Sequence, residues 1–173
     1  REWRAFLVAA VGMVGAGFGM RPHRTVVGAW HVLRANQLWA PYPDNDPAAA
    51  RQQMARFYRM ANKAGRLSVD PHNAAELEVA WWHVHRRQQH DPCYDEDDLV
   101  ASLIQLYRYL YQTSSEDVRH AAELRVEAMA LSDAWVAAGC RLDDPILARE
   151  RLALVASFAA LREASDRQAL RAS

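Results

Sequence analysis

Several residue types and patterns are scarce in this 173-residue chain, and each scarcity excludes a class of site. Cysteine occurs only at Cys93 and Cys140, so the chain lacks the Cys-x-x-Cys knuckle that is typical of structural zinc sites. No predicted strand precedes a glycine-rich loop, which argues against phosphate-binding and dinucleotide-binding motifs. No spacing indicates a nucleophile triad. The chain therefore carries no motif that implies a cofactor, and whether it is an enzyme stays open.

Neither sign of charge is in excess, because 21 acidic residues balance 21 basic ones. A neutral chain gives no support for broad, charge-driven binding to nucleic acids or membranes, and we expect no nucleic-acid partner. Lysine is almost absent: Lys63 is the one lysine, and every other basic residue is arginine. This usage indicates a GC-rich bacterial genome.

No apolar run is long enough to be a typical membrane-spanning helix. The longest run, residues 5–20, would form a helix of about 24 Å, whereas the hydrocarbon layer is about 30 Å thick. We predict that residues 1–20 form an apolar, glycine-rich helix that packs against the rest or serves as an interface arm. Membrane association through residues 5–20 is the alternative that we do not favour. No typical signal peptide is present, and we expect a cytoplasmic protein.

Helix signals are abundant, because alanine is common and glycine is rare. Aspartate is a good N-cap and proline suits the first helical position, so Asp-Pro pairs predict helix starts. Four such pairs occur, at Asp46-Pro47, Asp70-Pro71, Asp91-Pro92 and Asp144-Pro145. Asn73 and Ser114 resemble capping-box residues, and Gly139 resembles a C-terminal stop. The predicted helices are near 3–20, 24–40, 47–66, 73–90, 96–113, 115–138 and 145–170.

These helices predict an all-α fold. Apolar residues recur at three- and four-residue intervals, as in the stripe of Leu99, Leu103, Leu106 and Leu110. We predict one domain, residues 1–173, built as a bundle of about six to seven helices that are mostly antiparallel neighbours. Residues 152–161 are apolar almost all round, so we expect the last helix or the fifth-sixth hairpin at the centre.

The segment "WWHVHRRQQHDPCYDEDD", residues 81–98, is rich in potential metal ligands. On a helix, Leu77, Ala80, Trp81 and Val84 share a core face. His83 and His90 form a flanking stripe with Glu76, and His85 points nearer the core edge, so three histidines cannot bind one ion from a straight helix. The weak metal candidates are Glu76, His83, His90, Cys93 and Cys140. The acids at residues 95–98 suit the first turn of the next helix.

The two cysteines are expected at the same end of one helical hairpin. Cys93 precedes the fifth predicted helix and Cys140 follows the sixth, and a short break near Ser114 makes these helices antiparallel. Three interpretations stay open: two separate thiols, a disulfide, or a zinc site that includes His90.

Arg125 is the strongest ligand-binding candidate. It lies in the middle of an apolar face of the sixth predicted helix, where a desolvated guanidinium needs a carboxylate or an anionic ligand. Glu150 on the last helix is a possible partner. The alternatives are a structural ion pair, a ligand-binding arginine, and a side chain that extends to the rim of the bundle.

Six tryptophans suggest extensive packing or interface surfaces. Trp30, Trp81 and Trp135 fall on predicted apolar faces, whereas Trp39 and Trp82 lie off them and are expected to anchor a partner.

The leading functional hypothesis is a non-enzymatic helical bacterial protein that binds a protein partner or forms a homo-oligomer. One alternative is a small-anion or small-ligand sensor centred on Arg125. The other is a metal- or haem-dependent enzyme that recruits histidines from several helices. The available donors are His31, His83, His85 and His120.

Overall fold

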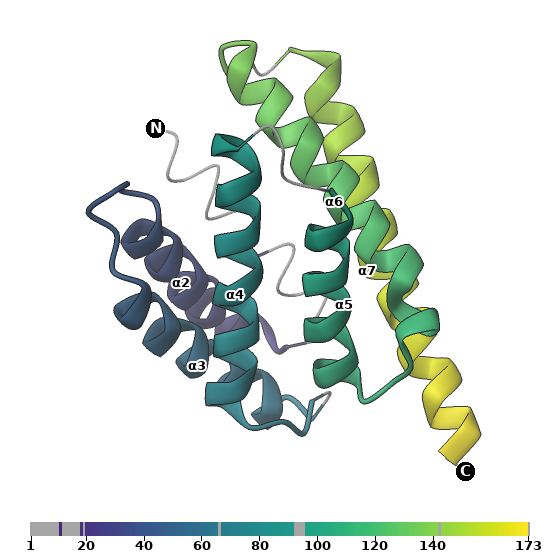
Figure 1. Ribbon diagram of the computed structural model, residues 1–173. Coiled ribbons are helices and arrows are strands. Elements are labelled where there is room, and N and C mark those ends of the chain that lie inside the picture. The colour runs from purple at the N-terminus through teal and green to yellow at the C-terminus, as the bar shows by residue number, and fades with distance from the viewer. Residues whose placement is uncertain are drawn as a thin grey trace. The chain divides into compact units, whose positions relative to one another are not determined.

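The computed structural model describes residues 11, 18, 20–65, 67–91, 96–141 and 143–172, and within these residues it contains helices and no strand (Figure 1). The helices are α2 (Pro22–Trp39), α3 (Pro47–Lys63), α4 (Pro71–His90), α5 (Glu96–Tyr111), α6 (Ser115–Ala137) and α7 (Pro145–Ala172). Neighbouring helices pack on one another, which confirms the predicted all-α bundle. The helix predicted over residues 3–20 falls almost entirely outside the described residues.

Most of the predicted helix starts are confirmed by their caps. Asp46 Oδ1 accepts a hydrogen bond from the Ala49 amide at 2.9 Å, and Ser114 Oγ accepts one from the Asp117 amide at 3.2 Å. At the start of α4, Asp70 Oδ1 accepts from the amide of Asn73 at 2.8 Å. The expected capping box at Asn73 is therefore wrong: Asp70, three residues earlier, caps the helix, and Asn73 lies inside it.

The chain divides into two compact units, residues 1–83 and 84–173, and the boundary falls within α4. In the first unit α2 packs on α3, through small buried residues such as Ala29 and Ala35 on α2 and Ala50 and Ala61 on α3. The part of α4 that belongs to this unit bonds to α3, since the Tyr58 hydroxyl donates to Glu78 Oε2 at 2.7 Å. The single-domain organisation of residues 1–173 stays a prediction.

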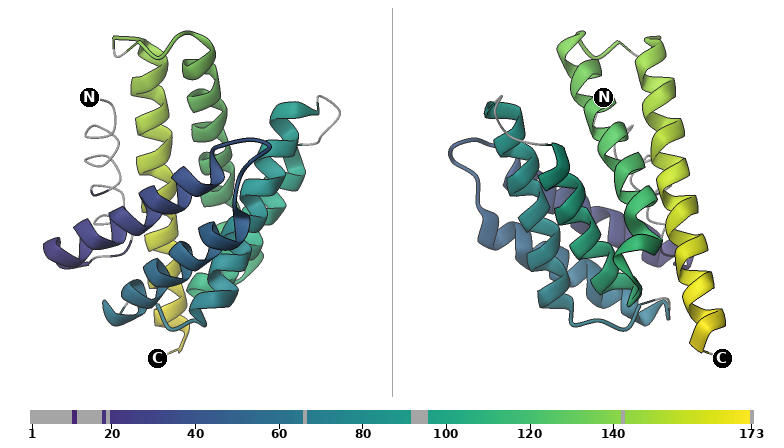
Figure 2. Two further views of the ribbon diagram at one scale, coloured as in Figure 1. Left: turned by 90° about the vertical axis from the view of Figure 1, so that its left-hand side faces the viewer. Right: turned by 45° about the vertical axis from the view of Figure 1, so that its right-hand side comes forward.

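In the second unit α6 packs on both α5 and α7, and α6 and α7 form an antiparallel hairpin (Figure 2). The predicted core stripe of α5 is confirmed, because Leu99, Leu103, Leu106 and Leu110 are all buried. The last helix is not central, however. Leu152 and Val155 on its outer face are 71% and 63% exposed. One apolar face of α7 thus packs against α6, and a second apolar face of α7 is exposed to solvent.

Two expectations are wrong, one about Ala80 on α4 and one about Trp39 on α2 and Trp82 on α4. Ala80 is exposed although it was placed on the core face, and Trp39 and Trp82 are buried although they were expected to anchor a partner. The two indole rings pack on each other with centroids 5.9 Å apart, and Trp82 Nε1 donates to Glu78 Oε1 at 3.3 Å. The buried face of α4 is therefore the one that carries Trp81 and Trp82. Trp30, by contrast, is 53% exposed.

Within the described residues, no helix combines the length and the apolar composition that crossing a bilayer requires.

Candidate functional site

Arg125 lies on α6 with its guanidinium against α7. Its Cζ atom is 6.0 Å from the centroid of the Phe158 ring, which is the outer limit of a cation–π contact. The side chain is half-buried, and no ion pair to a carboxylate is formed by Arg125 among the described residues. Arg125 is therefore partly desolvated, as the sequence predicts, and its guanidinium lies near an aromatic ring.

Glu150 lies on α7, and the charge of Arg125 acts on its carboxyl. Burial raises the pKa of the Glu150 carboxyl, and the charges of Arg125 and Arg151 act in the opposite direction.

This arrangement makes Arg125 a candidate for weak anion binding. A guanidinium that has no carboxylate partner keeps its donors for a ligand, but the carboxylate of Glu150 on the same hairpin opposes a second negative charge. The role of Arg125 and Glu150 in ligand binding stays a prediction. The sequence did not identify Phe158 as a neighbour of Arg125, because Phe158 is one of many apolar residues in an apolar run.

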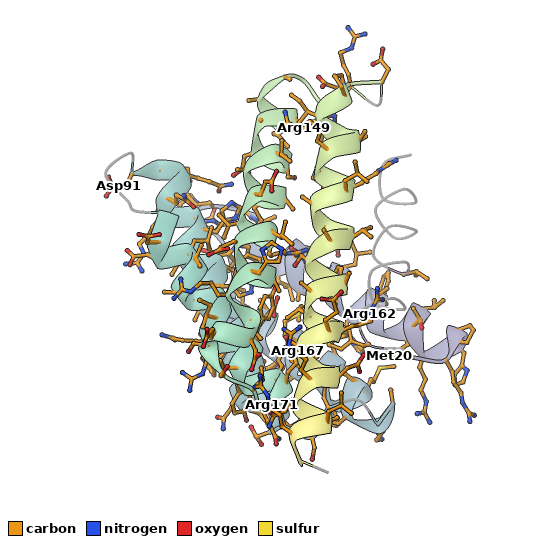
Figure 3. All side chains as sticks on the ribbon, turned by 90° about the vertical axis from the view of Figure 1, so that its right-hand side faces the viewer. Met20, Asp91, Arg149, Arg162, Arg167 and Arg171 are labelled. Carbon is orange, nitrogen blue, oxygen red and sulfur yellow. The ribbon has the colours of Figure 1, made fainter. Side chains whose placement is uncertain are left out.

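A second charged cluster lies at the start of α6. Asp117 Oδ2 accepts hydrogen bonds from Ser114 Oγ and Arg171 Nη1, each at 2.8 Å, and its Oδ1 lies 3.5 Å from Arg167 Nε. The two arginines come from the C-terminal half of α7, where Figure 3 labels them. The hydrogen bond from Ser114 is the largest influence on the Asp117 carboxyl, followed by Arg171, and together they lower its pKa to about 2. The cluster holds the end of α7 against the first turn of α6.

We expect Asp117→Asn to lower the free energy of unfolding near neutral pH. This difference from the wild type should disappear in acid. The Asp117 carboxyl has a pKa of about 2 in the folded protein and an ordinary value of 3.8, so ionisation stabilises the fold above about pH 4. That stabilisation falls away between pH 4 and pH 2. Urea unfolding followed by circular dichroism should show a gap between wild type and variant at pH 7 that closes over this range. Asp166→Asn, an exposed change on α7, is the control and should leave the acid dependence unchanged.

A histidine and a carboxylate meet where the end of α4 contacts α6. His85 Nε2 lies 3.0 Å from Asp133 Oδ2, and Gln89 Nε2 donates to Asp133 Oδ1 at 2.8 Å. The partly buried position of His85 agrees with its predicted place at the core edge. Asp133 was missed because it is 48 positions away from His85, and no local spacing links the two residues.

The weak metal candidates have separate surroundings. Glu76 Oε1 pairs with Arg51 Nε at 3.3 Å, and the His83 ring lies edge-on to Trp39 with centroids 4.5 Å apart. His90 is exposed. In the described part of the chain, no three side chains of His, Cys, Asp or Glu are grouped closely enough to hold a metal ion.

The interpretations that link the two cysteines depend on Cys93, which lies outside the described residues. Cys140 is an exposed free thiol. It follows Gly139, whose φ of +92° ends α6 as predicted.

The other two histidines proposed as donors also have local partners. His31 Nδ1 lies 3.0 Å from Gln53 Oε1, and His120 Nδ1 lies 4.0 Å from Glu123 Oε2 on the same helix. His31 is therefore explained by a polar contact between two helices, and His120 by a surface pair within one helix.

No family model, curated protein or solved structure matches the chain significantly.

Proposed function

We propose that the protein is a non-enzymatic helical protein that acts by self-association, and that the outer face of α7 is its contact surface. The observation that carries this proposal is the exposure of Leu152 and Val155, at 71% and 63%, on one face of a long helix. Large apolar side chains that adjoin one another in solvent are typical of surfaces that bind other proteins.

The spacing on α7 favours a second helix as the binding partner. Ala148, Leu152, Val155 and Ala159 follow one another at intervals of four, three and four residues, the repeat of a coiled-coil seam. We define these four residues as the α7 seam. The next positions of this repeat are Arg162 and Asp166, both exposed, so the apolar seam ends after about three helical turns.

The same spacing favours an antiparallel pairing of two copies. A parallel pair would place Arg162 against Arg162 of the second copy, which is repulsive. An antiparallel pair can set Leu152 against Val155, and Ala148 against Ala159, about a twofold axis. The surface is small, so we expect weak and reversible dimers rather than an obligate oligomer.

Sedimentation velocity over a range of protein concentrations tests this proposal. We expect the average mass of the wild-type chain to rise toward that of a dimer, and Val155→Glu to stay monomeric because it places a charge in the α7 seam. Val136→Glu is the matched control, since Val136 is 58% exposed on α6 outside the seam. A wild-type protein that stays monomeric at all concentrations, or a Val155→Glu variant that still dimerises, would contradict the proposal.

We also place the protein in the cytoplasm and regard a bacterial source as the expectation from its arginine usage.

A further inference from the structure

Helix α2 has an exposed apolar face that its packing on α3 does not use. Val26, Val27 and Trp30 are all exposed, and their spacing of one and three residues places them on one side of the helix. The other side is buried through residues that include Thr25, Ala29 and Leu33. Two valines and a half-exposed indole thus form an apolar surface one to two turns long, which we call the α2 face.

Basic residues lie at both ends of the α2 face. His23 is one turn before the valines, and Arg34 is one turn after Trp30 on the same side; both are exposed. The guanidinium of Arg34 donates to Gln37 Oε1 at 3.2 Å, a contact within α2 itself. Arg24 is partly engaged elsewhere, because its Nη1 donates to the Lys63 carbonyl at 3.0 Å.

Acidic residues are scarce in the N-terminal part of the sequence. The balanced charge of the whole chain conceals an asymmetry: residues 1–43 contain five arginines and one acid, Glu2, whereas residues 44–173 contain 20 acids and 16 basic residues. No Asp or Glu occurs anywhere in α2. The described arginines of this stretch, Arg21, Arg24 and Arg34, therefore have no carboxylate on α2 itself to neutralise them.

We propose that the α2 face docks on an anionic lipid bilayer, with Trp30, Val26 and Val27 inserted at the headgroup level and Arg34 bound to lipid phosphates. Tryptophan prefers the bilayer interface, and arginines beside an apolar helix face add attraction to anionic lipids. The helix lies along the surface and does not cross the bilayer, in keeping with its composition.

Charge and shape favour a bilayer over other occupants. A second copy of the α2 face would bring its own His23 and Arg34 against those of the first, and no acid on α2 would compensate them. The α2 face is the outer side of one helix with basic residues at its ends, which suits the flat anionic surface of a bilayer. No residue of the α7 seam belongs to the α2 face, so docking on lipid does not depend on self-association.

Co-sedimentation of the full chain with vesicles tests the proposal. One set of vesicles contains phosphatidylglycerol mixed with phosphatidylcholine, and the other contains phosphatidylcholine alone. We expect binding to the anionic vesicles that weakens with added salt. Trp30→Gln should lower the affinity by about tenfold or more, because an aromatic ring no longer enters the interface. Arg34→Gln should lower it by about fivefold, the contribution of one basic residue near an anionic surface.

The control is Arg56→Gln, which removes an exposed arginine from α3 and should retain wild-type binding. Circular dichroism checks that each variant is folded, and Val155→Glu should bind vesicles like the wild type. Equal binding to both kinds of vesicle, no binding at low salt, or full binding by a folded Trp30→Gln variant would each overturn the proposal. Binding of polyglutamate without binding of anionic vesicles would assign the α2 face to an acidic protein and would also overturn it.

Discussion

Replacing Leu103 with alanine should lower the free energy of unfolding by about 2–5 kcal/mol, one of the two largest effects we expect from a single change. Leu103 is 1% exposed and lies at the middle of the α5 stripe, where α5 packs on α6. Truncation removes three buried carbon atoms and leaves a cavity that the surrounding helices fill only in part. Urea unfolding of the variant, followed by circular dichroism, measures the loss.

The matched control for Leu103→Ala is Leu170→Ala, the same change at an exposed position of α7. Both substitutions occur within helices, and leucine and alanine have similar helix propensities, so the difference between the variants reports burial. We expect Leu170→Ala to change the free energy of unfolding by less than about 0.5 kcal/mol. Equal effects at the two positions would show that the α5 stripe is not a packed core.

Local signals explain why the helices could be predicted from the sequence. A cap acts within three residues, so Asp46 and Ser114 could be identified without knowing what packs nearby. The α5 stripe is equally local, because a period of three to four residues defines a buried face whichever helix covers it. The prediction of Asn73 as a helix cap was wrong because a second cap residue, Asp70, lies nearby. Asp70 accepts a hydrogen bond from the amide of Asn73 itself.

Partners in other helices explain most of what the sequence did not predict. The face of α4 depends on Trp82, whose burial requires Trp39 from another helix. The apolar run of α7 was interpreted as a central helix, because composition alone cannot distinguish a helix covered on every side from one that keeps a face for association.

The candidate site shows the same division between local and distant information. The sequence placed Arg125 on an apolar face, and the structure places it half-buried against α7. The sequence also suggested Glu150 as its partner. The charge of Arg125 does act on the Glu150 carboxyl, although the two side chains form no ion pair among the described residues. His85 was placed correctly near the core edge, whereas its partner Asp133 could be found only from the packing of α4 and α6.

Ala121→Leu should destabilise the protein by about 1–3 kcal/mol, because the hairpin of α6 and α7 depends on a close approach at this position. Ala121 is fully buried, and its carbonyl oxygen accepts a hydrogen bond from the buried hydroxyl of Ser157 on α7 at 2.9 Å. This hydrogen bond joins a side chain of α7 directly to the backbone of α6. The two helices are therefore too close at Ala121 to leave space for three more carbon atoms. Either the helices must separate, which breaks the Ser157 bond, or the leucine must adopt a strained rotamer.

Ala130→Leu provides the control for Ala121→Leu, because Ala130 lies on the same helix and is exposed. Its stability should stay within about 0.5 kcal/mol of the wild-type value. The double variant Ala121→Leu/Ser157→Ala separates the two causes: if lost space dominates, removing the hydroxyl should recover part of the stability, since alanine is smaller than serine. If Ala121→Leu unfolds at the same urea concentration as the wild type, α6 and α7 are packed loosely, and the small buried residues of the hairpin do not set the distance between them.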